Sequence, residues 1–203
     1  MFRGRRDAFR SAALFSRAEV LGSPCPVPRE PGVYGWWFRR VPGGMDTSEC
    51  LKRDGLALLY TGISPRRPPS NGRSPSSQRL RDRVRYHYSG NAEGSTLRKT
   101  LGSLLADEAG LELRRVGSGK RMTFGVGEPV LSAWMAENAM VSWIIEPEPW
   151  LLEAFLIADL DVPLNLEGNS RNRFHPELTA ARAKAVARAL AMPVIPNSGV
   201  GGR

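Results

Sequence analysis

The sequence predicts an α+β fold in which a small, mostly antiparallel central sheet of three strands is flanked by helices. Residues 33–40 and 56–61 are rich in β-branched, aromatic and aliphatic side chains, and turn-forming Pro and Gly residues lie close to both runs. A third run at 139–145 is mostly apolar and stops before Pro147. Because this run is so apolar, we expect it to lie in the centre of the sheet.

The overall composition limits the classes of molecule that the chain is expected to bind. The 203 residues suit one compact domain, the formal net charge is +9 and the isoelectric point is near 10.4. Such a charge favours a polyanionic partner such as nucleic acid, with an anionic membrane surface second. No apolar run approaches the ~20 residues that a membrane-spanning helix needs. We therefore expect nucleic acid, and no membrane, as the partner.

Two cysteines and the N-terminal segment bear on the cellular compartment. Cys25 and Cys50 have no metal-ligand spacing and are expected to be unpaired thiols in a reducing compartment. The first 19 residues are rich in Arg but lack the apolar core of a secretory signal. A mitochondrial transit peptide is the alternative, and Asp7 and Glu19 argue against it. We expect a soluble, cytoplasmic (intracellular) protein.

Changes in composition divide the chain into three parts. Residues 1–30 are expected to form an N-terminal helix at 7–21 and a Pro-rich connector. Residues 31–170 hold all three strands and form the main domain. Residues 171–203 form a C-terminal helix at 177–190 and a flexible tail, which pack on the same domain or trail it.

Loops and helices alternate between the expected strands. Residues 39–55 read as a long hairpin loop, and 64–77 as a mobile, basic loop too rich in Pro, Ser and Gly to pack. Ser77 is expected to cap the helix that follows this basic loop. The remaining elements are helices at 78–88, 96–109 (capped by Ser95 and ended by Gly110), 128–138 and 150–160, and a strand pair at 111–116 and 121–126.

Two polar side chains near the end of the main domain are candidates for chemistry. Glu153 has apolar neighbours on the expected helix at 150–160, and a carboxylate that is buried or faces a cleft needs a donor, a cation or a metal. The alternative is an exposed Glu at the solvent edge of an amphipathic helix. Asn165 follows twelve residues later, where its amide is placed to pin a loop onto the core.

The helix at 78–88 carries a second group of candidates. His87 shares one helix face with Leu80 and Val84, and Arg83 lies at the edge of that face. His87 is either a satisfied core histidine or a catalytic one. Residues 66–85 contain seven Arg against one Asp, so this run is either a solvated face or a grip on a phosphate backbone. The candidate nucleic-acid contacts are Arg66, Arg67, Arg73, Arg79, Arg81 and Arg85.

Five short motifs occur along the chain in a fixed order. They are Gly32-Val33-Tyr34, Tyr60-Thr61-Gly62, Arg83 with His87 four residues on, Glu153 on an apolar helix, and Pro163-Leu164-Asn165. Together they resemble the GIY-YIG nuclease family over about residues 31–166. Val33 replaces the family's isoleucine and Thr61 an apolar residue, and both replacements are strand formers. The resemblance implies that the three-stranded domain at 31–170 is a GIY-YIG-like domain with extra helices and a basic loop insertion.

The resemblance also implies a function. It indicates a metal-dependent endonuclease that hydrolyses phosphodiester bonds in nucleic acid, DNA more than RNA, with one Mg²⁺ (or Mn²⁺) ion held by Glu153. The alternatives are a catalytically inactive nucleic-acid-binding module of the same fold and a chance match in an Arg-rich protein. Because the sequence has no second recognisable DNA-binding domain, sequence specificity would have to come from the insertions or from a protein partner for targeting.

The same resemblance assigns roles to the catalytic residues. Arg83 would brace the phosphoryl oxygens with its fixed donor fork. Tyr34 or Tyr60 would orient or deprotonate the attacking water, which requires a nearby cation because the ordinary pKa of tyrosine is ~10. His87 would assist proton transfer. Asn165 belongs to the catalytic set as the residue that ties the loop to the core.

Overall fold

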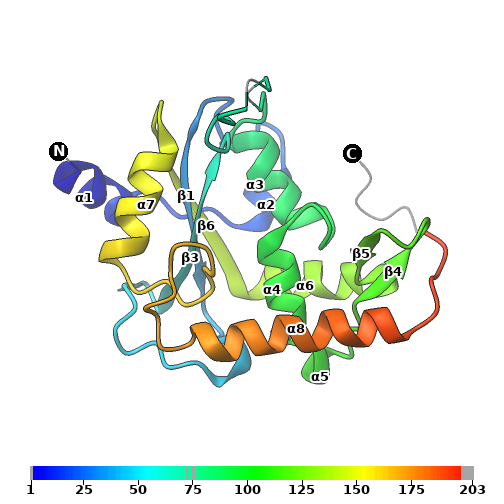
Figure 1. Ribbon diagram of the computed structural model, residues 1–203. Coiled ribbons are helices and arrows are strands. Elements are labelled where there is room, and N and C mark those ends of the chain that lie inside the picture. Colours follow the sequence, from blue (N-terminus) through cyan, green and yellow to red (C-terminus); the bar gives the residue numbers. More distant parts are fainter. Residues whose placement is uncertain (1, 72, 75, 198–203) are drawn as a thin grey trace.

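The computed structural model describes residues 2–71, 73–74 and 76–197, and it has the predicted α+β architecture (Figure 1). The main sheet is antiparallel, with the strand order β2–β3–β1–β6. Its strands are β1 (Gly32–Phe38), β2 (Lys52–Arg53), β3 (Leu56–Ser64) and β6 (Ala139–Ile145). The three predicted strands are therefore present, and β1 lies between β3 and β6.

The described residues also form helices and a small second sheet. The α-helices are α1 (Arg3–Ser11), α2 (Arg17–Leu21), α3 (Leu80–Ser89), α4 (Thr96–Leu104), α5 (Ala106–Ala109), α6 (Glu128–Asn138), α7 (Pro149–Asp159) and α8 (His175–Ala191). Two short 3-10 helices are η1 (Pro42–Gly44) and η2 (Gly125–Gly127), and the second sheet pairs β4 (Arg114–Val116) with β5 (Arg121–Thr123).

The main sheet differs from the prediction in two ways. A fourth strand, β2, lies inside the predicted loop at 39–55, and its two residues are too few to show a periodic pattern. Strand β6, predicted to be central, is an edge strand. The N-terminal segment covers this edge, because Phe15 exchanges two backbone hydrogen bonds of 2.9 Å with Val141 and stacks on Trp143. This contact covers the middle of the edge, where Val141 and Ser142 are buried, whereas Ile145 at the end of β6 is 50% exposed.

Helices cover both faces of the sheet. Along β1, Tyr34, Trp36 and Phe38 belong to one hydrophobic cluster, which includes apolar residues of α3, α4 and α6. Val33 and Trp37 alternate with them and belong to a second cluster with residues of α1 and α7. Figure 1 shows α1 and α7 on one side of the sheet and α3, α4 and α6 on the other. This two-sided burial explains why β1 is apolar throughout.

The N-terminal region forms two helices in place of the single helix predicted at 7–21. The chain leaves the helical path between α1 and α2 so that Phe15 can pair with β6. Helix α2 then starts with its own capping box, formed by Ser16 and Glu19. Pairing with a distant strand has overridden the local helical pattern.

The cap of α3 also differs from the prediction. The helix begins at Leu80 and its N-cap is Arg79, whose backbone N–H donates to the Asp82 carboxylate over 3.1 Å. The predicted cap, Ser77, lies further from the helix. The helix predicted at 96–109 is divided at Leu105 into α4 and α5. Its predicted ends are confirmed: Ser95 caps α4, and Gly110 ends α5 in the left-handed conformation that favours glycine.

The C-terminal helix packs on the rest of the chain. Helix α8 contacts α4 and β4, and Ile195 beyond it pairs with Val116 of β4. Most of the tail predicted to be flexible, residues 196–203, lies outside the described residues. Within the described part of the chain, Cys25 and Cys50 are free thiols, as predicted, and no helix is both long and apolar enough to cross a membrane.

Candidate active site

An open cleft of about 770 Å³ collects the side chains that the sequence singles out. It is lined by parts of β1, β3, α3, α7 and α8 and by the loop after α7. Five of the six predicted catalytic residues line it, and so do two of the predicted nucleic-acid contacts: Tyr34, Tyr60, Arg83, Glu153, Asn165, Arg66 and Arg67. Residues far apart in the sequence therefore meet in one basic cleft.

The two tyrosines lie on neighbouring strands. In the antiparallel register of β1 and β3, Tyr34 is opposite Gly62 and Trp36 is opposite Tyr60. The Tyr34 ring lies against Gly62 so closely that a Cβ atom at position 62 would be 2.6 Å from the Tyr34 hydroxyl. Only glycine leaves room for this ring, which explains the glycine in the second motif.

Tyr34 is part of a buried chain of polar groups. Its hydroxyl lies 2.8 Å from Nε2 of His87, and Nδ1 of His87 lies 2.7 Å from Oγ of Ser95. Nε of Arg83 donates to the Tyr34 oxygen over 3.4 Å, so the phenolic proton is free to point at His87. Burial raises the pKa of Tyr34, and burial and then the positive charges of Arg83 and Arg98 hold the pKa of His87 well below its ordinary value. His87 is therefore neutral and reaches the cleft only through Tyr34.

Arg83 presents a permanent positive charge to the cleft. It is 8% exposed, and Nη1 donates to the backbone oxygen of Gly94 over 2.7 Å. Burial lowers the pKa of Arg83, but the nearby oxygens of Tyr34, Tyr60 and Tyr86 raise it, and their combined effect is larger. The pKa of Arg83 is therefore raised above its ordinary value. No hydrogen bond to a described residue uses Nη2, which leaves donors of the guanidinium for an anion.

Tyr60 differs from Tyr34 in its surroundings. It is 8% exposed, and its hydroxyl makes no hydrogen bond to any residue that the structure describes. Burial raises the pKa of Tyr60, while Arg83 and Arg66 act in the opposite direction. The hydroxyl is therefore protonated near neutral pH and available to a molecule in the cleft.

The Glu153 side chain is half-buried, and its carboxyl group makes no hydrogen bond or ion pair with any residue that the structure describes. Burial and then the negative charge of Glu167, which lines the same cleft, raise its pKa to about 7. Arg66 and Arg83 partly offset this shift. A divalent cation would supply the missing partner, so the residues present fit a metal ion. Since the described residues contain no cluster of three or more His, Cys, Asp or Glu, water and substrate would complete its coordination, as Mg²⁺ prefers.

Asn165 holds the loop after α7 against β3. Its side-chain oxygen accepts from the Thr61 N–H over 2.9 Å, and its amide group donates to the Thr61 carbonyl over 2.8 Å. The side chain is 6% exposed, and both ends of the amide are occupied. Asn165 therefore ties the loop to the strand between Tyr60 and Gly62, in agreement with the structural role expected for it.

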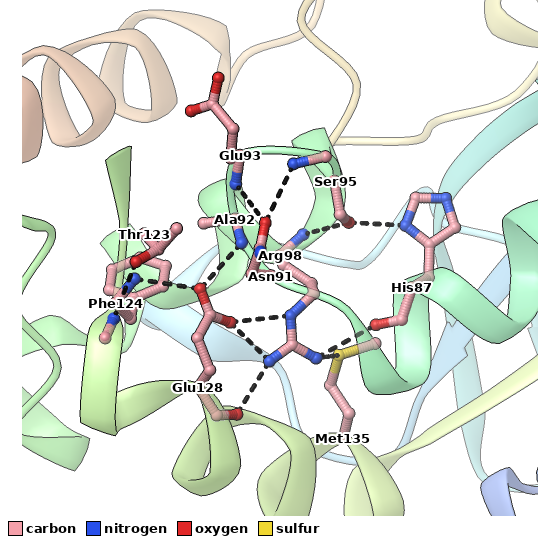
Figure 2. Close-up of polar contacts among 12 residues, drawn as sticks. His87, Asn91, Ala92, Glu93, Ser95, Arg98, Thr123, Phe124, Glu128 and Met135 are labelled. Carbon is pink, nitrogen blue, oxygen red and sulfur yellow. Dashed lines mark hydrogen bonds and ion pairs between the residues drawn. The ribbon is translucent and has the colours of Figure 1, made fainter. Parts of the chain in front are cut away.

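A buried ion pair that sequence reasoning missed supports the wall of the cleft (Figure 2). Arg98 on α4 and Glu128 on α6 are both fully buried, with Nη2 and Nε of Arg98 at 2.7 and 3.0 Å from Oε2 of Glu128. Arg98 also donates to the His87 carbonyl over 3.2 Å. Its backbone N–H donates to Ser95, the partner of His87. Two charges this far apart in the sequence form no recognisable motif.

The other predicted nucleic-acid contacts are placed differently from Arg66 and Arg67. Nε of Arg81 donates to the Val27 carbonyl over 2.6 Å, and Nη1 of Arg85 donates to the Val20 carbonyl over 2.8 Å. These two side chains tie α3 to the N-terminal segment. Arg79 bonds the adjacent Gln78 carbonyl, and Arg73 is exposed on the loop after β3. Contact of all six arginines with nucleic acid stays a prediction.

Several residues of the cleft carry no signal in the sequence. Arg182 comes from α8, which reads as an ordinary exposed helix rich in Ala and Arg. The others come from α4, α7 and the loop that Asn165 holds: Thr96, Trp150 and Glu167. None of them stands in a motif, because only packing brings their elements to the cleft.

Comparison with known protein families identifies the domain. The family model of the GIY-YIG catalytic domain matches residues 32–184. The chain belongs to this family. Members of the GIY-YIG family are endonucleases that act on nucleic acid and generally use a divalent metal. The match includes the first part of α8. Comparison with curated proteins and with solved structures found no match.

Removing one partner of the buried ion pair should strongly destabilise the fold. Glu128→Ala leaves the Arg98 charge buried and unpaired, so we expect a loss of about 3–5 kcal/mol in the free energy of unfolding. Glu108→Ala is the control, because it breaks the exposed pair with Arg40 and should cost less than about 1 kcal/mol. Urea denaturation measures both. Equal losses in the two variants would show that breaking the buried pair costs no more stability than breaking an exposed pair.

The raised pKa of Glu153 should make stability fall as pH rises. The folded chain keeps the Glu153 proton up to about pH 7, whereas the ordinary value is 4.5, so the folded state binds more protons between these values. The wild type should lose about 1–2 kcal/mol more than Glu153→Gln between these pH values, after allowance for solvent screening. Glu137→Gln, an exposed change on α6, should follow the wild type. Parallel pH profiles of Glu153→Gln and the wild type in urea denaturation would contradict this.

Proposed function

We propose that this protein is a metal-dependent endonuclease that hydrolyses internal phosphodiester bonds of nucleic acid, with DNA favoured over RNA. The observation that carries the proposal is the convergence of Tyr60, Arg83 and Glu153 on one basic cleft in a GIY-YIG domain. These three groups match the needs of phosphodiester hydrolysis, which are a positioned water, positive charge at the phosphoryl oxygens and a carboxylate for a cation.

Glu153 is the residue that we assign to the metal, with Glu167 nearby in the same cleft. A divalent ion such as Mg²⁺ or Mn²⁺, when bound, would supply positive charge that stabilises an ionised water and the phosphoryl oxygens. The cation would also favour the ionised carboxyl of Glu153, whose pKa burial and Glu167 raise to about 7 in the free protein. The free carboxyl is therefore poised to take up a metal near neutral pH.

Arg83 and the tyrosines act on the substrate and on the attacking water in this scheme. The free donors of Arg83 bind the phosphoryl oxygens, where negative charge grows in the transition state. Tyr60 positions the water, because its hydroxyl faces the cleft without a protein partner. Tyr34 is held by His87 and Arg83 and orients Arg83 rather than the water. Asn165 keeps the strand of Tyr60 in place.

The free cysteines and the basic segment after β3 bear on the cellular compartment of the enzyme and on its sequence specificity. The two free cysteines agree with a reducing compartment such as the cytoplasm. Choice of a particular nucleic-acid sequence would fall to the basic segment after β3 or to a protein partner.

Cleavage assays test the metal-dependent reaction. Supercoiled plasmid and labelled single-stranded DNA and RNA are incubated with wild type, Glu153→Gln or Glu137→Gln, in Mg²⁺, Mn²⁺ or chelator. We expect metal-dependent cutting of DNA that falls about 100-fold or more in Glu153→Gln, because a main electrostatic stabiliser is lost. A Mg²⁺-dependent rise in melting temperature should disappear in the same variant. Glu137→Gln should resemble the wild type in both measurements.

Other outcomes of these assays have distinct meanings. Salt-sensitive binding without cutting by the wild type would replace the enzyme with the inactive nucleic-acid-binding module. Equal cutting by wild type and Glu153→Gln would remove Glu153 as the metal ligand. Preferential cutting of RNA would correct the substrate class and leave the mechanism in place.

Phenylalanine variants test the division of labour between the tyrosines. Tyr60→Phe should lower kcat about 100-fold with little change in KM, because a group that positions the nucleophile is lost. Tyr34→Phe should lower kcat about tenfold, since it weakens only the orientation of Arg83. Single-turnover cleavage of labelled DNA measures both. If Tyr34→Phe has the larger effect, Tyr34 is the group that acts on the water.

A further inference from the structure

Arg182 is a cleft residue that the scheme above leaves without a role. It projects from α8, which follows the motif residues in the chain, and it lines the same cleft as Tyr60 and Glu153. The side chain is half-buried, and it makes no hydrogen bond or ion pair with any residue that the structure describes. Burial lowers the pKa of Arg182, and the nearby Tyr60 oxygen only partly offsets this.

Two other arginines that are partly or fully buried have protein partners. Arg115 donates to the carbonyls of Ala189 and Met192, and Arg98 pairs with Glu128. A guanidinium has five donors, and removing it from water without an acceptor is unfavourable. The carboxylates in the cleft do not approach it closely enough to form an ion pair. Arg182 therefore has no partner among the described residues, and its donors are available to an anion in the cleft.

The position of Arg182 indicates which anion it takes. Figure 1 shows the segment after β3, which carries Arg66 and Arg67, at one end of the molecule and α8 toward the opposite end. Strand β3, which carries Tyr60, lies between them. All of these residues line one cleft, so an elongated polyanion that runs along β3 meets positive charge from the segment after β3 and from α8.

We propose that Arg182 forms a second phosphate-binding position on α8, which holds the nucleic-acid strand on the side of the reacting phosphate opposite Arg66 and Arg67. This inference rests on the proposed function, because it assumes that nucleic acid occupies the cleft. A strand held on both sides presents an internal phosphodiester to Tyr60 and Arg83. The arrangement thus selects a continuous strand as substrate and does not require a free end.

Salt-dependent binding tests the role of Arg182 without any need for cleavage. Fluorescein-labelled single-stranded and duplex DNA are titrated with the full chain in chelator at several salt concentrations. Arg182→Gln should weaken binding roughly tenfold, as expected for one charge-assisted hydrogen bond. It should also lower the slope of log K against log salt by about 0.7 for single strands or about 0.9 for duplex, the value for one phosphate contact.

Two further variants serve as controls. Arg188→Gln removes the same charge from the same helix, but Arg188 is 55% exposed, pairs with Asp107 and lies outside this cleft, so its slope should equal that of the wild type. Arg182→Lys keeps the charge and loses the planar fork, so it should keep the slope while affinity falls severalfold. Melting temperatures close to the wild-type value show that the variants are folded. If Arg182→Gln does not fold, the test is whether Arg182→Lys lowers the affinity severalfold while Arg188→Gln leaves it unchanged.

Each outcome supports or overturns the assignment. Wild-type binding with equal slopes for Arg182→Gln and Arg188→Gln would overturn the role of Arg182 and leave the proposed nuclease intact. A reduced slope that Arg182→Lys does not restore would show that the effect comes from altered packing of α8, and would overturn it too. A wild type that binds neither these DNAs nor labelled single-stranded RNA would overturn both proposals together.

Discussion

The antiparallel pairing of β1 with β3 is the constraint on which the rest of the structure depends. Its register sets Tyr34 opposite Gly62 and brings Tyr60 onto the neighbouring strand. The close approach of the Tyr34 ring to Gly62 leaves no room for a side chain there. Asn165 bonds both backbone groups of Thr61, so the loop after α7 is tied to the same strand. A slip of β3 by one residue would turn Tyr60 to the other face of the sheet, away from the cleft.

The polar groups around this strand pair fall into two sets that differ in whether the protein satisfies them. Tyr34, His87 and Ser95 form a closed, neutral chain that runs inward from the cleft, and Arg98 of the Arg98–Glu128 pair bonds its inner end (Figure 2). Buried networks of this kind are rigid because each member has its partner. Tyr60, Glu153 and Arg182 face the cleft without such partners. Rigid support behind unsatisfied groups is what pre-organised binding of a charged substrate requires.

Much of the fold could be predicted, because strand composition and turn residues reflect local structure. The cleft residues were predicted from the five motifs, which resemble those of a known family. The three long strands, the cap of α4 by Ser95 and the helix that carries Glu153 follow from composition and turn residues. The short strand β2 was missed although it pairs locally with β3, across Asp54 and Gly55. The break between α1 and α2 and the edge position of β6 have a different cause, because they depend on pairing between distant segments. Local propensity contains no information about such partners.

The sequence by itself determined the family, the order of the motif residues and the positive charge that favours nucleic acid. These properties are local or compositional, so they can be read without coordinates. Only the tertiary structure decided that Tyr34 is occupied by His87 while Tyr60 is open, and that Glu153 and Arg182 lack partners. Burial, hydrogen bonding and pKa depend on which surfaces meet in three dimensions. For that reason the chemistry of each residue could be assigned only after its neighbours were known.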